Sequence, residues 1–200
     1  MKTLIINCYR NRQDEKIKDY FGLISNLSSY EYDVKYHRDI EKNHNVENYN
    51  FIIISGSENC ISKKQYSPDF LEFLKRVNIP VLGICYGHQI IAKAFSVEII
   101  HGSEAINKPY PERPEEVQIL DKNEIFIGLK NKINVYESHQ EYVNPEYLDK
   151  FGIKLLASSK SCPVEAFKHL KRPLYGVQFH IERSGEVGKK IISNFYKLVV

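Results

Sequence analysis

Apolar residues form two kinds of pattern in the first half of the chain. The runs at 3–7, 51–55 and 81–85 are mainly aliphatic, which is typical of strands buried on both faces of a sheet. Residues 14–27 and 68–77 instead carry apolar side chains three and four positions apart, as amphipathic helices do. This alternation predicts an α/β fold with a mostly parallel open sheet flanked by helices.

The second half is predicted to be rich in strands and partly antiparallel. Further strands are expected at 32–36, 97–101, 115–120, 133–137, 154–157, 163–167 and 174–179, with a closing helix at 186–198. Two polar segments are expected to be loops. In the loop at 37–50 we expect His37 and His44 to be solvated. The proline-containing loop at 102–114 is either a connector or a lid or docking surface beside the site.

Composition narrows the class of protein. Two hundred residues that are 42% hydrophobic fit one domain spanning 1–200. The 28 basic and 25 acidic residues are dispersed and leave a net charge of +3, so we expect no nucleic-acid partner. No apolar run reaches the roughly 18 residues that span a bilayer, so we expect no membrane partner. The four cysteines lack metal or disulfide spacing and no signal peptide is evident, which indicates a cytoplasmic protein without a metal or cofactor.

A sharp turn is predicted at Cys85, between a strand and a helix. Gly83 and Gly87 flank Cys85 at the spacing that lets a strained turn expose one nucleophilic side chain. The first turn of a helix also lowers the pKa of a thiol. The alternative is a small buried core cysteine, because free cysteines are often buried. The two flanking glycines favour the nucleophile.

A base for this nucleophile is predicted near the end of the chain. His180 follows the last expected strand, at a sheet edge where α/β proteins collect catalytic groups. Glu182 lies two residues later, where its carboxylate would orient the imidazole. A lone histidine after a strand is more often structural. Together with Cys85, however, the pattern predicts a Cys-His-Glu triad.

These motifs resemble those of the class I glutamine amidotransferases. The family's motifs are Gly-x-Cys-x-Gly-His-Gln and Gly-Val-Gln-Phe-His-Pro-Glu; here residues 83–89 read Gly-Ile-Cys-Tyr-Gly-His-Gln and residues 176–182 read Gly-Val-Gln-Phe-His-Ile-Glu. The strand before Ser55 and Gly56 also matches, so the resemblance spans nearly the whole chain. It implies a flavodoxin-like fold that hydrolyses the side-chain amide of L-glutamine through a Cys85 thioester.

The resemblance also implies roles for other residues. An oxyanion would be held by backbone N–H groups of Tyr86 and of the Gly56–Ser57 turn, and Gln89 would contact the substrate. Ser138 and His139 would line the wall that recognises its α-amino and carboxylate groups. From the residues alone, Ser138 and His139 could equally cap a strand end.

Within the family the chain looks most like the separate glutaminase subunit of archaeal-type GMP synthases. This likeness rests on Ser138-His139 with an acidic residue close behind, and on Pro-Val-Glu-Ala at 163–166. It implies a partner, an ATP-dependent synthetase subunit of the ATP-pyrophosphatase kind that forms GMP from XMP. A stand-alone γ-glutamyl hydrolase and a non-catalytic regulatory relative are the alternatives.

Two residues depart from the family pattern. Ile181 replaces the usual proline and is expected to loosen the turn that sets Glu182. Ser57 replaces a second glycine and is expected to resist a positive φ.

Overall fold

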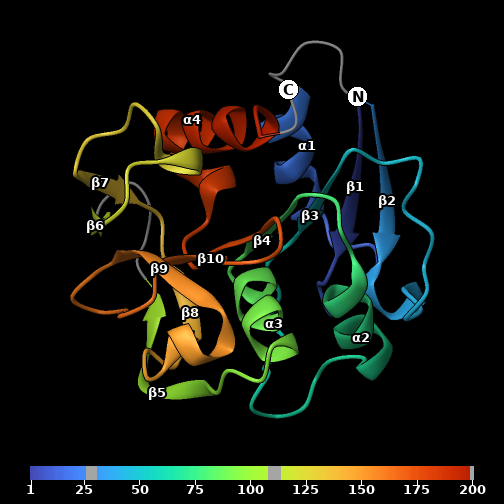
Figure 1. The fold of residues 1–200 in the computed structure, drawn as a ribbon, viewed down its shortest axis with the longest axis horizontal. Helices are drawn as coiled ribbons and strands as arrows, with labels where there is room; N and C mark the ends of the chain where they lie inside the picture. Colours follow the sequence, from blue (N-terminus) through green and yellow to red (C-terminus); the bar gives the residue numbers. More distant parts are fainter. Residues whose placement is uncertain (26–30, 108–113, 199–200) are drawn as a thin grey trace.

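A twisted sheet forms the centre of the molecule (Figure 1). The computed structural model describes residues 1–25, 31–107 and 114–198. Within these ranges the sheet has nine strands, in the order β2 (Glu31–Tyr36), β1 (Lys2–Asn7), β3 (Phe51–Ile54), β4 (Val81–Ile84), β11 (Leu174–Val177), β10 (Ala166–His169), β9 (Ile153–Ser158), β6 (Glu115–Ile119) and β7 (Lys132–Val135). Beside it, β5 (Ile99–Asn107) and β8 (Ser138–Val143) form a two-stranded antiparallel sheet.

The central sheet has a parallel half and an antiparallel half. Strands β2, β1, β3, β4 and β11 run parallel to their neighbours. From β11 onward the pairs with β10, β9, β6 and β7 are antiparallel. This division confirms the predicted α/β class, with its β-rich second half. The carboxyl ends of β3, β4 and β11 therefore meet at one edge.

Helices cover both faces of the parallel half. Helices α1 (Ile17–Ser25) and α4 (Gly185–Tyr196) lie on one face, and α2 (Pro68–Arg76) and α3 (Tyr86–Ala94) lie on the other (Figure 1). The sheet separates two hydrophobic cores. Ile5 packs into the core with α1 and α4, whereas Leu4 and Ile6 pack into the core with α2 and α3. Because alternate side chains of a strand point to opposite faces, both cores need aliphatic residues from the same run.

Several element boundaries differ from the prediction. Helix α1 begins at Ile17, because residues 14–16 form turns instead. Strand β10 begins at Ala166 rather than at Pro163, since proline cannot donate to the ladder. Strand β5 continues to Asn107 and so occupies the start of the predicted 102–114 loop. The rest of that loop, 108–113, lies outside the described residues.

The prediction that His37 is solvated is wrong. Its side chain is fully buried in a short 3₁₀ turn and contacts the rings of Tyr36, Phe70 and Tyr86. Burial, with a smaller effect of Arg38, lowers the pKa of His37 to about 4, so the ring is neutral at pH 7. His44 is partly exposed, as a loop histidine is expected to be.

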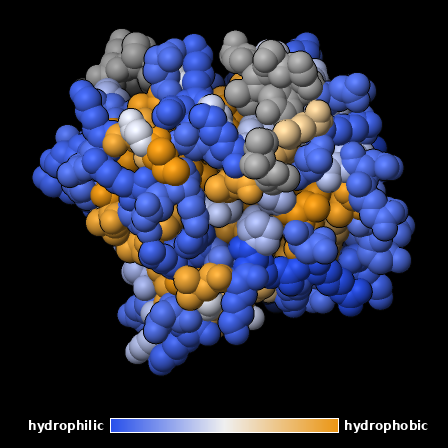
Figure 2. Space-filling model, turned by 45° about the horizontal axis from the view of Figure 1, so that its top comes forward, coloured by the Kyte–Doolittle hydropathy of each residue, from blue (hydrophilic) through white to orange (hydrophobic). Residues whose placement is uncertain are grey.

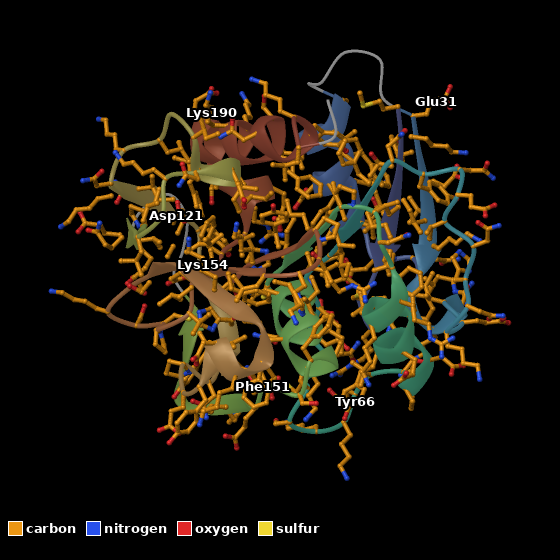
Figure 3. The ribbon with its side chains drawn as sticks, viewed as in Figure 1. Glu31, Tyr66, Asp121, Phe151, Lys154 and Lys190 are labelled. Carbon is orange, nitrogen blue, oxygen red and sulfur yellow. The ribbon has the colours of Figure 1, made fainter. Side chains whose placement is uncertain are left out.

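The surface mixes polar and apolar groups, as the dispersed charges predict. Figure 2 shows polar residues interleaved with small apolar areas on one face. Ion pairs join neighbouring elements: Lys154 on β9 lies 2.6 Å from Asp121, which follows β6 (Figure 3). Such exposed pairs contribute little individually. Among the described residues, no helix is long and apolar enough to cross a membrane.

Helix α4 packs closely on the short 3₁₀ helix that follows β11, η4 (Ile181–Arg183). A Cβ atom at Gly188 would lie 1.8 Å from the backbone oxygen of Ile181. We therefore expect Gly188→Ala to lower the free energy of unfolding by roughly 1–3 kcal/mol or more, because backbone atoms must move.

Gly22→Ala is the matched control for this prediction. Gly22 lies in α1 and nothing lies within 4 Å of its added Cβ, so the exchange should stabilise by about 0.4–1 kcal/mol. Urea denaturation of both variants measures the difference. Equal free energies of unfolding would contradict the packing described here.

Candidate active site

The turn between β4 and α3 is strained and closely packed. Cys85 has φ 52° and ψ −102°, a conformation that costs a non-glycine residue about 1–3 kcal/mol. Cβ atoms added at Gly83 and Gly87 would lie 2.3 Å from the Gly87 oxygen and 2.5 Å from the Ile54 oxygen, respectively. Only glycines allow this approach of α3 to β3 and β4. The predicted sharp turn at Cys85 is therefore present.

His180 and Glu182 are joined directly. His180 Nδ1 lies 2.6 Å from Glu182 Oε1, and the Glu182 side chain is fully buried. Burial lowers the pKa of His180, but the charges of Glu182 and of the Cys85 sulfur outweigh it and hold the pKa well above its usual range. Ile181 does not loosen this turn as expected, because its own side chain is buried in the core beneath α4.

The Cys85 and His180 side chains meet beside Gly56, which follows β3. A Cβ atom on Gly56 would lie 3.1 Å from His180 Cε1 and 3.7 Å from Cys85 Cβ. A larger residue would therefore push the imidazole away. The Cys85 sulfur donates to the Ser138 carbonyl and accepts from Gln178 Nε2, each over 3.7 Å. The structure thus brings Cys85, His180 and Glu182 together.

Side chains fix the turn at Gly56 and Ser57. The Gly56 N–H donates to the Tyr20 hydroxyl over 2.8 Å, whereas the Ser57 N–H makes no hydrogen bond within the described ranges. The Ser57 hydroxyl donates to the Cys8 carbonyl over 2.6 Å. Ser57 has no positive φ, so the expected backbone conflict at this residue does not arise. The serine instead ties the turn to the end of β1.

A cavity of about 220 Å³ opens beside Cys85. Its walls are the 57–60 segment, Gln89 on α3, and the first four residues of β8, 138–141. Gln89 Nε2 donates to the Glu141 carbonyl over 2.6 Å and to Gln178 Oε1 over 3.1 Å. The residues predicted to contact a substrate, Gln89, Ser138 and His139, therefore share one cavity with Cys85.

Comparison with known proteins identifies the family. Residues 17–199 match the family model for class-I glutamine amidotransferases. The chain belongs to this family. The glutamine-hydrolysing subunit of GMP synthase from Thermococcus kodakarensis is 44% identical over 150 residues, which is 74% of each chain. The corresponding GMP synthase subunit from Pyrococcus abyssi is 42% identical over 151 residues, again 74% of each chain.

Solved structures show the same amidotransferase fold. A protein of Thermoplasma acidophilum, provisionally assigned as this same GMP synthase subunit, superposes with a TM-score of 0.80 at 24% identity, covering 100% of this chain and 94% of that one. A glutamine amidotransferase from Thermotoga maritima gives 0.70 at 18% identity, covering 99% and 83%. At these identities the likeness establishes the fold.

Three residues of this amidotransferase site were not predicted from the sequence. Tyr20 reaches the Gly56 turn from α1, and Gln178 contacts the Cys85 sulfur. Glu141 is buried, and its carboxylate accepts the N–H groups of Ile61 and Ser62, over 2.6 Å and 3.0 Å, which fixes the loop over the cavity. The only signal for each was a polar side chain within an otherwise apolar pattern.

The other cysteines are poorly suited to react. Burial raises the pKa of the Cys8 and Cys162 thiols well above the usual range, and partial burial beside Glu141 raises that of Cys60. We therefore expect iodoacetamide at pH 7 to label Cys85 first, because His180 lies ready to take its proton. Peptide mass spectrometry after brief labelling measures this, with Cys85→Ala as the control. Equal labelling of all four cysteines would contradict it.

Proposed function

We propose that this chain hydrolyses the side-chain amide of glutamine through a Cys85 thioester and supplies the ammonia for GMP synthesis. One observation carries the proposal: a strained-turn cysteine meets a histidine that a buried carboxylate holds at 2.6 Å, beside a small cavity. Family membership supports glutamine as the substrate. The relatives named as glutamine-hydrolysing subunits of GMP synthase favour GMP formation over the alternative of a stand-alone hydrolase.

The proposed reaction has two halves. The Cys85 thiolate attacks the amide carbon, and the protonated His180 gives its proton to the departing ammonia. Water then attacks the glutamyl thioester while His180 accepts a proton, and glutamate leaves with Cys85 restored. Glu182 stabilises the imidazolium and fixes the ring so that Nε2 serves the reacting atoms.

Two backbone N–H groups are proposed to bind the oxyanion. The Tyr86 N–H lies in the first turn of α3, where the helix dipole favours negative charge. Ser57 is the better second donor, because Tyr20 already occupies the Gly56 N–H. Removing one such donor typically costs about 10²–10³ in rate. Gln89, Ser138 and His139 would bind the rest of the glutamine.

Changes in the triad test the reaction. Cys85→Ala should abolish ammonia release from glutamine, because no nucleophile remains. Glu182→Gln should lower kcat by about 10–10³, less than the roughly 10⁴ seen when a serine protease loses its orienting carboxylate, because the thiolate–imidazolium pair depends less on it. Steady-state assays of glutamate formation measure both variants. Wild-type kcat in either would overturn the assignment.

The ammonia needs an acceptor enzyme. We propose that a synthetase subunit of the ATP-pyrophosphatase kind docks at the Cys85 edge in the cytoplasm and uses the ammonia to convert XMP to GMP. An amidotransferase that hydrolyses glutamine without its acceptor wastes it, so the isolated chain should be slow.

Mixing the chain with such a synthetase tests this partnership. Glutaminase activity should rise, mainly through kcat, and the rise should require XMP and ATP, because contacts made in the transition state raise kcat. Ammonium salts should replace the chain in GMP formation. An isolated chain that already turns over glutamine at about 10 s⁻¹ or more, unaffected by the synthetase, would support the stand-alone hydrolase instead.

A further inference from the structure

Two buried carboxyl groups lie behind the His139 wall of the cavity. Glu137 precedes β8 and is 1% exposed, and Glu165 precedes β10 and is fully buried. His139, on β8, is 7% exposed and lines the cavity, whereas neither carboxyl group does. Buried acidic residues are costly unless a proton or a cation compensates them, so the state of this cluster is informative.

The contacts of His139 require a shared proton. Its Nδ1 lies 3.0 Å from the Glu141 carbonyl oxygen, which only accepts, so Nδ1 carries a hydrogen. Its Nε2 lies 3.0 Å from Glu137 Oε2. An unprotonated Nε2 would face a carboxylate lone pair across this distance. A second hydrogen therefore lies between Nε2 and Glu137, which makes the pair an imidazolium and a carboxylate.

Glu165 supplies a further proton. It is hydrogen-bonded to Glu137, and two carboxylates in contact in a buried site do not both ionise. Burial raises the pKa of Glu165 well above its usual range, and the charge of Glu137 raises it further. The cluster therefore consists of an imidazolium, a carboxylate and a carboxylic acid, and its net charge is zero.

We propose that Glu137 and Glu165 are positioning residues that hold His139 as a cation on the cavity wall, where it receives the α-carboxylate of the amino-acid substrate. The proposal rests on the glutaminase function proposed above. The positive end of the cluster faces the cavity and its negative end lies behind, so an anionic group in the cavity meets the cation first. The enclosed setting strengthens this attraction.

The groups that face Glu165 determine its response to pH. They are Glu137, His139, Ser159 and Cys162. The pKa of the Cys162 thiol is itself raised well above its usual range by burial, so this group stays neutral. As the pH rises through the raised pKa of Glu165, that residue loses its proton and repels Glu137. We expect KM for glutamine to rise at alkaline pH, with less change in kcat.

Two isosteric variants separate the roles. Glu137→Gln removes the charge that holds the imidazolium, so KM for glutamine should rise about 10–100-fold, the factor for a lost charge-assisted hydrogen bond, with kcat little changed. Glu165→Gln mimics the protonated acid, so KM at pH 7 should stay at the wild-type value and its alkaline rise should disappear. Glu116→Gln, at an exposed carboxylate paired with Lys132, is the control.

A substrate analogue distinguishes recognition from a general structural effect. Glutamine α-amide lacks the carboxylate that His139 is proposed to receive. Its KM should therefore be the same in the wild type and in Glu137→Gln. A parallel rise in KM for glutamine and for the α-amide would overturn the proposal, as would an unchanged KM for glutamine in Glu137→Gln.

Nitrogen-15 NMR of the histidine rings tests the charge without any turnover. At pH 7 the His139 ring of the wild type should show the shifts of an imidazolium, and in Glu137→Gln those of a neutral ring. A neutral ring in the wild type would overturn this inference while leaving the Cys85→Ala test of glutaminase activity unaffected. An imidazolium that Glu137→Gln neutralises would support the charged cluster even in a preparation that hydrolyses no glutamine.

Discussion

The close approach of α3 to β3 and β4 is the constraint on which the site depends. It requires glycine at residues 83 and 87, because a methyl group at either would overlap backbone atoms. The same approach forces Cys85 into a positive φ and directs its side chain toward the common edge of β3, β4 and β11. His180 reaches that edge because β11 pairs with β4. The sheet order, rather than any single contact, thus assembles the three side chains.

Much of this arrangement was predictable because its signals are local. Aliphatic runs gave the buried strands, and glycine spacing gave the turn at Cys85. The errors arose where distant residues decide the outcome. His37 lies in a polar run but is buried by Phe70 and Tyr86, which come from two different helices. Tyr20 reaches Gly56 across 36 positions of sequence. Such tertiary contacts leave no periodic trace in the chain.

The site keeps its positive charges by pairing each with a buried acid. His180 is paired with Glu182, and His139 is paired with Glu137. The two pairs differ in exposure to the reaction, since the first lies at the sulfur and the second at the far wall of the cavity. Because the interior is poorly hydrated, neither ring would stay charged without its acid. Family membership alone does not specify this electrostatic division within the site.

The strained backbone at Cys85 has an evolutionary consequence. A glycine or asparagine there would adopt the same φ with less strain, so selection for folding alone would favour replacing the cysteine. Selection for chemistry acts in the opposite direction at this one position. A gene copy released from its chemical duty would therefore lose Cys85 early and keep its fold. Retention of a cysteine in this conformation is itself a record of continued use.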